Sequence, residues 1–338
     1  MSQQQRDAVL RVEDLSIVYR SKRGDVKATS NVSFDLYPGE ALALIGESGS
    51  GKTTISLALI RKLPKNAVIT SGNIHYQRDG SVQDLLKLSN RQLREFRWKD
   101  CAMVFQGAQN AFNPVLKIRR QFEDTAQSHG WTDKAAIRER ALNLLKLVRL
   151  DPERVYDSYP HELSGGMKQR TLLALGVLLN PQIVILDEPT TALDILTQRA
   201  IIDVLNDMQR QLRFSIIFIS HDLSLAAEMA DTVATVYAGE IVEIGPVNDI
   251  FYRSLHPYTY GLLTSVPTLE HLQDHLQSIP GSPPNLINPP NGCKFHPRCA
   301  FATDACHKDS PPLERDIGTH PAACWHKDRL LESRKEPV

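Results

Sequence analysis

The sequence reads Gly46-Glu47-Ser48-Gly49-Ser50-Gly51-Lys52-Thr53 directly after an apolar run at 41–45 and before helical periodicity at 52–63. The spacing Gly-x-x-x-x-Gly-Lys-Thr in this setting is typical of a phosphate-binding loop. Its glycines let backbone N–H groups face phosphate oxygens, and the helix N-terminus adds positive potential. We expect Lys52 to reach the β- and γ-phosphates of a nucleotide and the Thr53 hydroxyl to ligate Mg²⁺. A glycine-rich turn without a ligand is the alternative interpretation.

On either side of this loop, short apolar runs alternate with helical segments. Nearly continuous apolar runs are typical of strands buried in a parallel sheet, and they lie at 41–45, 101–105, 183–186 and 215–219. Helical periodicity lies at 52–63, 134–149, 165–179, 195–212 and 222–230. Residues 10–19 and 31–37 instead alternate apolar and polar side chains, as in a half-solvated antiparallel layer. The order predicts an α/β fold with an inserted helical subdomain at about 107–170.

A pair of acidic residues ends one predicted buried strand, where Asp187 and Glu188 follow the run 183–186. In such a sheet, the carboxyl end of this strand meets the phosphate-binding loop. We expect Asp187 to hold the Mg²⁺ shell and Glu188 to polarise the attacking water. An acidic pair at a strand end is often only a helix cap, but the phosphate-binding loop upstream favours the catalytic interpretation.

Composition limits the classes of partner. The 338 residues suffice for one large domain with a small appendage. Lys plus Arg (39) balance Asp plus Glu (39), so no overall basic field favours nucleic acid or anionic lipid as the main partner. Residues 1–15 lack an apolar signal segment, and no run approaches the roughly 20 apolar residues of a membrane span. We therefore expect a cytosolic chain that only partner proteins hold at a membrane.

The C-terminal region has a different composition. Residues 279–291 are too rich in Pro, Asn and Gly for a helix or central strand. Four of the five cysteines follow, at Cys293, Cys299, Cys306 and Cys324. In a reducing cytosol such a cluster favours metal binding over disulfides. The spacings C-x5-C, C-x6-C and C-x17-C match neither common zinc sites nor ferredoxin runs, so spacing leaves zinc, iron–sulfur and free thiols open. For zinc, the further candidate ligands are His296, His307 and His326.

A third motif, Leu163-Ser164-Gly165-Gly166-Met167-Lys168-Gln169-Arg170, opens a predicted helix shortly before the acidic strand. Together with the phosphate-binding loop and the Asp-Glu strand, it resembles the signature of the ABC ATPase family. The resemblance implies a P-loop NTPase (RecA-like) ABC nucleotide-binding domain with an antiparallel β layer and a helical subdomain. It also implies that Ser164 and Gly166 contact the γ-phosphate of ATP held by an opposite subunit. One chain would then supply half of each of two composite sites.

The remaining family motifs occur in order. Gln106, after the run 101–105, resembles the glutamine that senses Mg²⁺ and lytic water, and His221 resembles the histidine that binds the γ-phosphate. Ala192-Leu193-Asp194 resembles the loop that crosses the dimer interface, and Tyr19 resembles the aromatic platform for adenine. The implied catalytic residues are Glu188, His221 and Gln106. The implied Mg²⁺ ligands are Thr53, Gln106 and Asp187. The implied ATP-binding residues are Tyr19, Gly46, Ser48, Gly49, Ser50, Gly51, Lys52, Thr53, Thr54, Ser164, Gly166 and Asp194.

Short segments narrow the resemblance, which covers about 8–338, to ATP-binding subunits of oligopeptide and dipeptide permeases. These segments are Asn113-Pro114, Tyr159-Pro160-His161-Glu162, His256-Pro257-Tyr258-Thr259, Gly292-Cys293 and Pro297-Arg298-Cys299. The resemblance implies a nucleotide-binding domain at 8–260 and a C-terminal oligopeptide-permease-type domain at 261–338, whose four cysteines bind a 4Fe–4S cluster. The implied partners are two membrane permease subunits, a second homologous ATPase subunit and an extracellular or periplasmic substrate-binding protein, at the cytoplasmic face of the membrane.

The predicted function is ATP hydrolysis coupled to peptide uptake. Relatives with the same C-terminal pattern serve oligosaccharides and nickel, and residues 107–109 depart from the acidic-Pro pair that many members carry, so substrate class stays open. A homodimer of ATPase subunits also stays open. A soluble ABC ATPase acting on nucleic acid or the ribosome usually has two cassettes, a long coiled-coil insertion or basic arms, and none occurs here. A degenerate scaffold is disfavoured because the sequence keeps Lys52, Asp187, Glu188 and His221.

Overall fold

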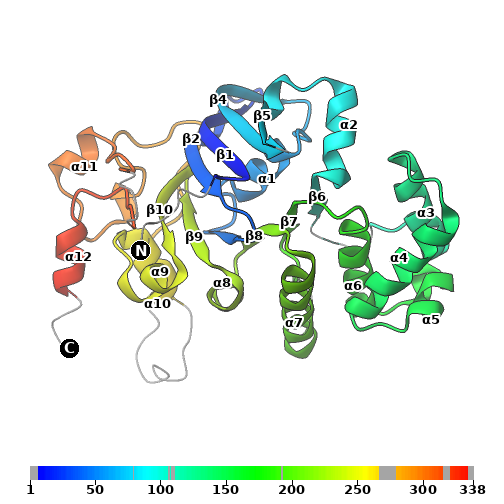
Figure 1. Cartoon of the computed structure of the whole chain (residues 1–338). Coiled ribbons are helices and arrows are strands. Elements are labelled where there is room, and N and C mark those ends of the chain that lie inside the picture. The colour runs from blue at the N-terminus through cyan, green and yellow to red at the C-terminus, as the bar shows by residue number, and fades with distance from the viewer. Residues whose placement is uncertain are drawn as a thin grey trace. The chain divides into compact units, whose positions relative to one another are not determined.

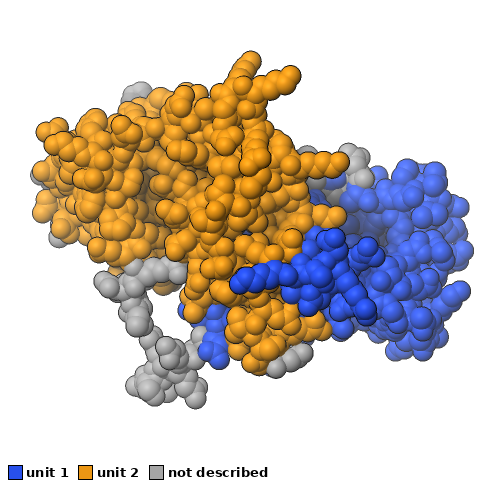
Figure 2. All heavy atoms as spheres, turned by 90° about the horizontal axis from the view of Figure 1, so that it is seen from above, with its two compact units in different colours: residues 1–8, 36–41, 87–219 blue, residues 9–35, 42–86, 220–338 orange. Residues whose placement is uncertain are grey.

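The computed structural model describes residues 7–78, 80–105, 107, 111–191, 193–265, 279–314 and 320–333. The chain divides into two compact units, which Figure 2 shows in different colours. We name the first the phosphate-loop unit, and it comprises residues 9–35, 42–86 and 220–338. The second, which we name the helical unit, comprises residues 1–8, 36–41 and 87–219.

One sheet of the phosphate-loop unit has four strands in the order β2-β1-β4-β5 (Figure 1). They are β1 (Leu10–Tyr19), β2 (Val26–Leu36), β4 (Ala67–Arg78) and β5 (Ser81–Asp84). β1 and β5 both pair antiparallel with β4. The buried positions of β1 depart from strict alternation because the register shifts between Glu13 and Ser16, where Asp14 has φ +48°. This irregularity keeps Val12 and Leu15 on the buried side although they lie three residues apart.

A second group of strands in this unit begins with β3 (Ala41–Ile45), whose residues are all buried. β3 pairs parallel with β9 (Thr232–Tyr237), and β9 pairs antiparallel with β10 (Glu240–Pro246). The helices of the unit are α1 (Lys52–Leu59), α8 (Leu223–Met229), α9 (Val247–Arg253), α10 (Pro257–Thr264), α11 (Asp304–Lys308) and α12 (Lys327–Ser333).

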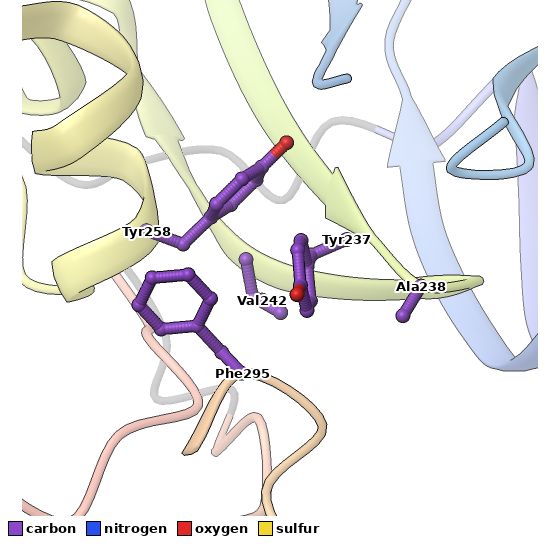
Figure 3. Packing of buried hydrophobic residues seen from close by; sticks show 5 residues of the cluster. All are labelled: Tyr237, Ala238, Val242, Tyr258 and Phe295. Carbon is purple, nitrogen blue, oxygen red and sulfur yellow. The ribbon is translucent and has the colours of Figure 1, made fainter. Parts of the chain in front are cut away.

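The C-terminal part of this unit is joined to β9 and β10 by a buried cluster of Tyr237, Ala238, Val242, Tyr258 and Phe295 (Figure 3). The rings of Tyr237 and Phe295 pack edge to face with their centroids 5.2 Å apart, and the centroids of the Tyr258 and Phe295 rings lie 5.5 Å apart. Because aromatic pairs of this kind each add about 0.5–1.5 kcal/mol beyond burial, the cluster stabilises the attachment of the region around Phe295.

The helical unit contains three parallel strands in the order β8-β7-β6. They are β6 (Cys101–Val104), β7 (Ile183–Asp187) and β8 (Ser215–Ser220). Its helices are α2 (Asn90–Lys99), α3 (Ile118–Ser128), α4 (Lys134–Leu147), α5 (Pro152–Asp157), α6 (Gly165–Gly176) and α7 (Ile195–Leu212). Every residue of β7 and β8 is buried, as expected of strands covered on both faces.

These elements confirm the predicted α/β fold with parallel strands and an antiparallel layer. The predicted helix at 52–63 is shorter than expected: α1 ends at Leu59, Arg61 has φ +48°, and Pro64 follows. The pairs β4–β5 and β9–β10 were not predicted. None of the helices in the described ranges combines the length and the hydrophobicity of a membrane span.

Candidate functional site

The phosphate-binding loop joins β3 to α1, as predicted, and its backbone requires glycine at two positions. Gly46 has φ +145°, and a Cβ there would lie 2.2 Å from the Val236 carbonyl oxygen. Gly51 has φ +106°, and a Cβ there would lie 2.4 Å from the Ala28 carbonyl oxygen. No side chain fits so close to backbone atoms. The loop is therefore held against β2 and the end of β9.

Lys52 lies inside this loop and is only 6% exposed. Its Nζ donates to the carbonyl oxygens of Gly46 and Glu47, each at 2.8 Å, and to Ser50 Oγ at 3.3 Å. The ammonium group is thus surrounded by the backbone that would hold phosphate oxygens. α1 begins at Lys52 and has no side-chain cap, so its first backbone N–H groups suit an anion.

Tyr19, the predicted adenine platform, ends β1 close to this loop. Its hydroxyl lies 3.1 Å from Oγ1 of the buried Thr54 in the first turn of α1. Thr53, the predicted Mg²⁺ ligand, is exposed. The structure therefore brings Tyr19 together with the phosphate-binding loop.

His221 belongs to the same unit, directly after β8, and is exposed. The turn that presents it is fixed by its neighbours. Asp222 caps α8 by accepting the Ser224 and Leu225 N–H groups, and the Asp222 N–H donates to Ser220 Oγ at 2.9 Å. His221 is thus presented from a rigid strand-to-helix turn.

The acidic pair lies in the helical unit at the end of β7. Asp187 is 3% exposed, and Glu188 has φ +49°, an uncommon conformation for a residue with a side chain. The Glu188 N–H donates to the Ile219 carbonyl oxygen at 3.0 Å, and Thr191 Oγ1 donates to Glu188 Oε2 at 2.9 Å. The chain therefore turns sharply at Glu188, and Thr191 orients its carboxylate. Such departures from common backbone geometry concentrate at functional sites.

The signature segment and Asp194 share one groove in the helical unit. Ser164 is the N-cap of α6 and accepts the Met167 N–H at 3.3 Å. Asp194 is the N-cap of α7 and accepts from both the N–H and the hydroxyl of Thr197, which lowers the Asp194 pKa. A Cβ on Gly166 would lie 2.8 Å from Thr197 Cγ2, so glycine lets the two helix starts approach. The groove has a volume of about 470 Å³, and it is lined by Ser164, Gly165, Gly166, Arg170, Leu193, Asp194, Leu196, Thr197 and Ala200.

Sequence reasoning identified Ser164, Gly166 and Asp194 but missed Thr197, because its role depends on the contact between α6 and α7. Beside the groove, Ile195 and Leu196 are 82% and 83% exposed. Gln106, and Ala192 of the loop that precedes Asp194, lie outside the described residues. The predicted ATP-site residues thus form two groups, one in each unit, and each group has the local geometry described above.

The four C-terminal cysteines lie together in the phosphate-loop unit, where all four line one cavity of about 10 Å³. The Cys293 N–H donates to the Cys306 carbonyl oxygen at 2.9 Å, and burial raises the pKa of Cys293 and of Cys299 to about 11. Within the described residues, the four are free thiols, and no group of three or more Cys, His, Asp or Glu is placed to hold a metal ion. The predicted convergence of the thiols is present, whereas the metal centre stays a prediction.

The predicted histidine alternatives lie near these thiols. His296 and His326 line the same cavity, and the rings of His296 and His307 lie 4.2 Å apart. His296 Nδ1 is already 2.9 Å from the Cys293 carbonyl oxygen, and His326 Nε2 is 2.8 Å from Thr303 Oγ1.

One contact that sequence reasoning missed joins this region to the phosphate-binding loop. Arg298, between His296 and Cys299, forms an ion pair with Glu47 at 2.7 Å. The hydrogen bonds to Glu47 raise the pKa of Arg298. Glu47 belongs to the loop motif and Arg298 to a subfamily motif, but the sequence has no signal that links positions 251 residues apart.

Known proteins resemble this chain over most of its length. Residues 29–191 match the family model described as "ABC transporter", and residues 242–306 match "Oligopeptide/dipeptide transporter, C-terminal region". The chain is 45% identical to the dipeptide transport ATP-binding protein DppD of Caldanaerobacter subterraneus over 94% of this chain and 96% of that protein. It is 41% identical to the oligopeptide transport ATP-binding protein OppD of Bacillus subtilis, over 94% and 88% of the two chains.

Two solved structures have a similar fold. A dimeric ATP-binding cassette, MJ0796, in a post-hydrolysis state bound to ADP and Pi, superposes with a TM-score of 0.61 at 25% identity, over 70% of this chain and 98% of that one. The cbiO1 protein of Clostridium perfringens, part of the ABC transporter complex cbiONQ, superposes with a TM-score of 0.62 at 27% identity, over 73% and 92%.

Proposed function

The chain belongs to the ABC transporter family, among the ATP-binding subunits of oligopeptide and dipeptide transporters, and we propose that ATP hydrolysis at its phosphate-binding loop drives peptide uptake. It is the ATP-hydrolysing subunit of an ABC transporter. The observation that carries the proposal is the loop itself, in which tight glycine contacts hold the backbone around the ammonium group of Lys52.

We assign each predicted residue a role in hydrolysis. Lys52 holds the β- and γ-phosphates, and Thr53, Gln106 and Asp187 are the residues that would hold Mg²⁺. When bound, Mg²⁺ neutralises charge on the phosphate oxygens. Glu188, oriented by Thr191, accepts a proton from the attacking water, and His221 holds the γ-phosphate. This assignment is supported by the sharp turn at Glu188 and by the capped turn that presents His221.

The groove at the start of α6 supports a composite site. We propose that Ser164, Gly166 and Asp194 face the nucleotide of a second, homologous ATPase subunit that is a different chain. The support is that Ser164 and Asp194 are exposed and that Leu196 beside them is 83% exposed. The dimeric MJ0796 cassette, bound to ADP and Pi, has the same fold. Closure of such a dimer around ATP, and its reopening after hydrolysis, would move the permease subunits.

The remaining partners follow from the importer family. We propose two membrane permease subunits, an extracellular or periplasmic substrate-binding protein, and a peripheral position at the cytoplasmic face of the membrane. Peptides are the proposed substrate, because the curated relatives are named for dipeptide and oligopeptide transport. Oligosaccharide or nickel uptake is the alternative.

We propose that Cys293, Cys299, Cys306 and Cys324 hold a 4Fe–4S cluster, with zinc as the alternative. The supporting observation is that the four thiols line one cavity. A cavity of about 10 Å³ holds at most about one water molecule, so the thiols would have to move apart to admit a cluster. Four thiolates suit either metal, and a structural role fits a loop-rich region.

The test of this function is reconstitution with the cognate permease subunits and binding protein in vesicles. A dipeptide with its binding protein should stimulate ATP turnover and accumulate in the vesicles, and Lys52→Ala should abolish both effects. Stimulation by nickel or an oligosaccharide, with no response to peptides, would support the alternative substrate class. Turnover that does not change with Lys52→Ala would contradict the proposed site.

A further inference from the structure

We propose that Arg298 is a positioning residue for the phosphate-binding loop, and that it acts by clamping the carboxylate of Glu47. The inference rests on the proposed ATP site and adds to it a residue from the C-terminal region. Arg298 Nη1 donates to Glu47 Oε2 at 2.7 Å, and Nη2 donates to Oε1 at 2.8 Å. This two-point geometry fixes the direction of the carboxylate as well as its distance.

The ion pair is largely shielded from water. The Arg298 side chain is 5% exposed and that of Glu47 is 25% exposed. Two further donors of Arg298 also have partners, because Nε donates to the Pro280 carbonyl oxygen at 2.8 Å and Nη1 lies 3.4 Å from the Tyr237 hydroxyl. A guanidinium group held on several sides is a rigid support for the residue that it binds.

Glu47 in turn fixes the part of the loop that faces the nucleotide. Its backbone N–H donates to the Tyr258 hydroxyl at 2.8 Å, and its carbonyl oxygen accepts from Lys52 Nζ at 2.8 Å. The same carbonyl oxygen accepts the Ser50 N–H at 3.2 Å. Arg298 and Tyr258 thus hold Glu47 from outside the loop, and Glu47 contacts the lysine that we assign to the phosphates.

The segment that carries Arg298 is itself anchored between two cysteines. Phe295 packs in the aromatic cluster with Tyr237 and Tyr258 (Figure 3). Lys294, 9% exposed, pairs with Glu240 at 2.9 Å and donates to the Ala238 carbonyl oxygen at 3.0 Å. The five residues between Cys293 and Cys299 therefore send three side chains toward β9, β10 and the phosphate-binding loop. Through these contacts, the folding of the thiol-lined region affects the position of the phosphate-binding loop and therefore nucleotide binding.

A purely structural role makes a different prediction. If Arg298 only attached the C-terminal region, its loss would lower thermal stability and leave nucleotide affinity unchanged. His320 provides the matched control, because its Nε2 lies 2.7 Å from Oε1 of the fully buried Glu243 on β10. This contact also attaches the C-terminal region within the same unit, and neither partner belongs to the phosphate-binding loop.

The test measures the dissociation constant for ADP by calorimetry on the full chain, together with the melting temperature. The variants are Arg298→Gln, Arg298→Lys, Glu47→Gln, the double variant Glu47→Gln/Arg298→Gln, and the control His320→Gln. We expect Arg298→Gln and Glu47→Gln each to weaken ADP binding about tenfold, with Arg298→Lys intermediate because it cannot bind at two points. The double variant should bind ADP no more weakly than Arg298→Gln, since both changes remove the same interaction.

His320→Gln should lower the melting temperature and keep ADP affinity within about twofold of wild type. The inference is overturned if Arg298→Gln and Glu47→Gln also stay within this range. If Arg298→Gln does not fold, Glu47→Gln and Arg298→Lys decide by the same criterion. Failure of the proposed function is distinct, because the wild-type chain itself would then bind no ADP and Lys52→Ala would change nothing.

Discussion

At the scale of single residues, Glu188 has an uncommon backbone conformation and a carboxylate that is oriented by a hydrogen bond. The strand β7 ends in buried Asp187, and the chain then adopts φ +49° at Glu188. The hydroxyl of Thr191 fixes one carboxylate oxygen at 2.9 Å. A carboxylate oriented in this way suits proton transfer from water better than direct binding of phosphate, which carries the same charge.

Glu188→Gln should therefore keep nucleotide affinity and lower turnover. The amide preserves size and hydrogen bonding but is a very weak base, so we expect turnover to fall by roughly 10²–10⁴-fold. The measurement compares ATP affinity with the steady-state rate of phosphate release. If affinity fell as steeply as turnover, Glu188 would be a binding residue and its catalytic role would be wrong.

Lys52→Ala should instead lower the affinity for nucleotide itself. Removal of the ammonium group takes positive charge from the phosphates themselves, so ATP and ADP affinity should fall by more than about tenfold. Because Lys52 is buried, its truncation also loosens the packing of the loop, which is a second cause of lower nucleotide affinity. Lys52→Met, which keeps most of the side-chain volume, is the control. Wild-type affinity in Lys52→Met would show that the charge does not act on the nucleotide.

Prediction of single residues succeeded where a local motif fixes both the residue type and its position between a strand and a helix. Gly51 and Lys52 follow from spacing, and the contacts of Gly51 with Ala28 explain why the position must be glycine. Prediction failed where function depends on contacts between distant segments. The Glu47–Arg298 pair joins the phosphate-binding loop to the C-terminal region, and neither residue has a local pattern that indicates its partner.

At the scale of elements, buried parallel strands were the most predictable because their apolar runs have few alternatives. β3 and the run that became β7 were located within a residue. The strands β9 and β10 were missed, because β9 carries buried polar Thr235 and β10 carries buried Glu243. Glu243 is compatible with the interior because His320 and the N–H groups of Leu255 and His256 contact its carboxylate.

The cluster proposed at the four C-terminal cysteines can be tested by colour and by metal content. Protein purified without oxygen should be brown, with a broad absorption near about 400 nm and about four irons per chain, because thiolates bind such clusters. Cys→Ser at any of the four positions should bleach the colour and increase proteolysis after residue 280. The reason is that the Pro-rich region would lose its internal link.

A colourless anaerobic preparation that contained one zinc and no iron would contradict the cluster and leave the four ligands standing. Cys101 supplies the matched control. It is buried on β6, in the other unit, and burial raises its pKa, so Cys101→Ser should not change the colour.

At the scale of the whole molecule, the ATP-site residues are divided between two kinds of surface. Lys52, at the start of α1, has its ammonium group enclosed by the phosphate-binding loop, whereas Ser164 and Asp194 line an open groove with exposed apolar neighbours. A groove of this kind suits the binding of a second molecule. The domain boundary predicted at about 260 stays a proposal, because the two units divide the chain elsewhere and combine distant segments.

The central claim is that hydrolysis needs two chains, and the rate of ATP turnover per chain at different chain concentrations tests it most directly. Light scattering after size exclusion would assign each sample as monomer or dimer. We predict weak turnover in monomeric samples, a rise in rate per chain as dimers form or as the homologous ATPase subunit is added, and no rise with Glu188→Gln. Full turnover by a sample that is demonstrably monomeric would contradict the claim.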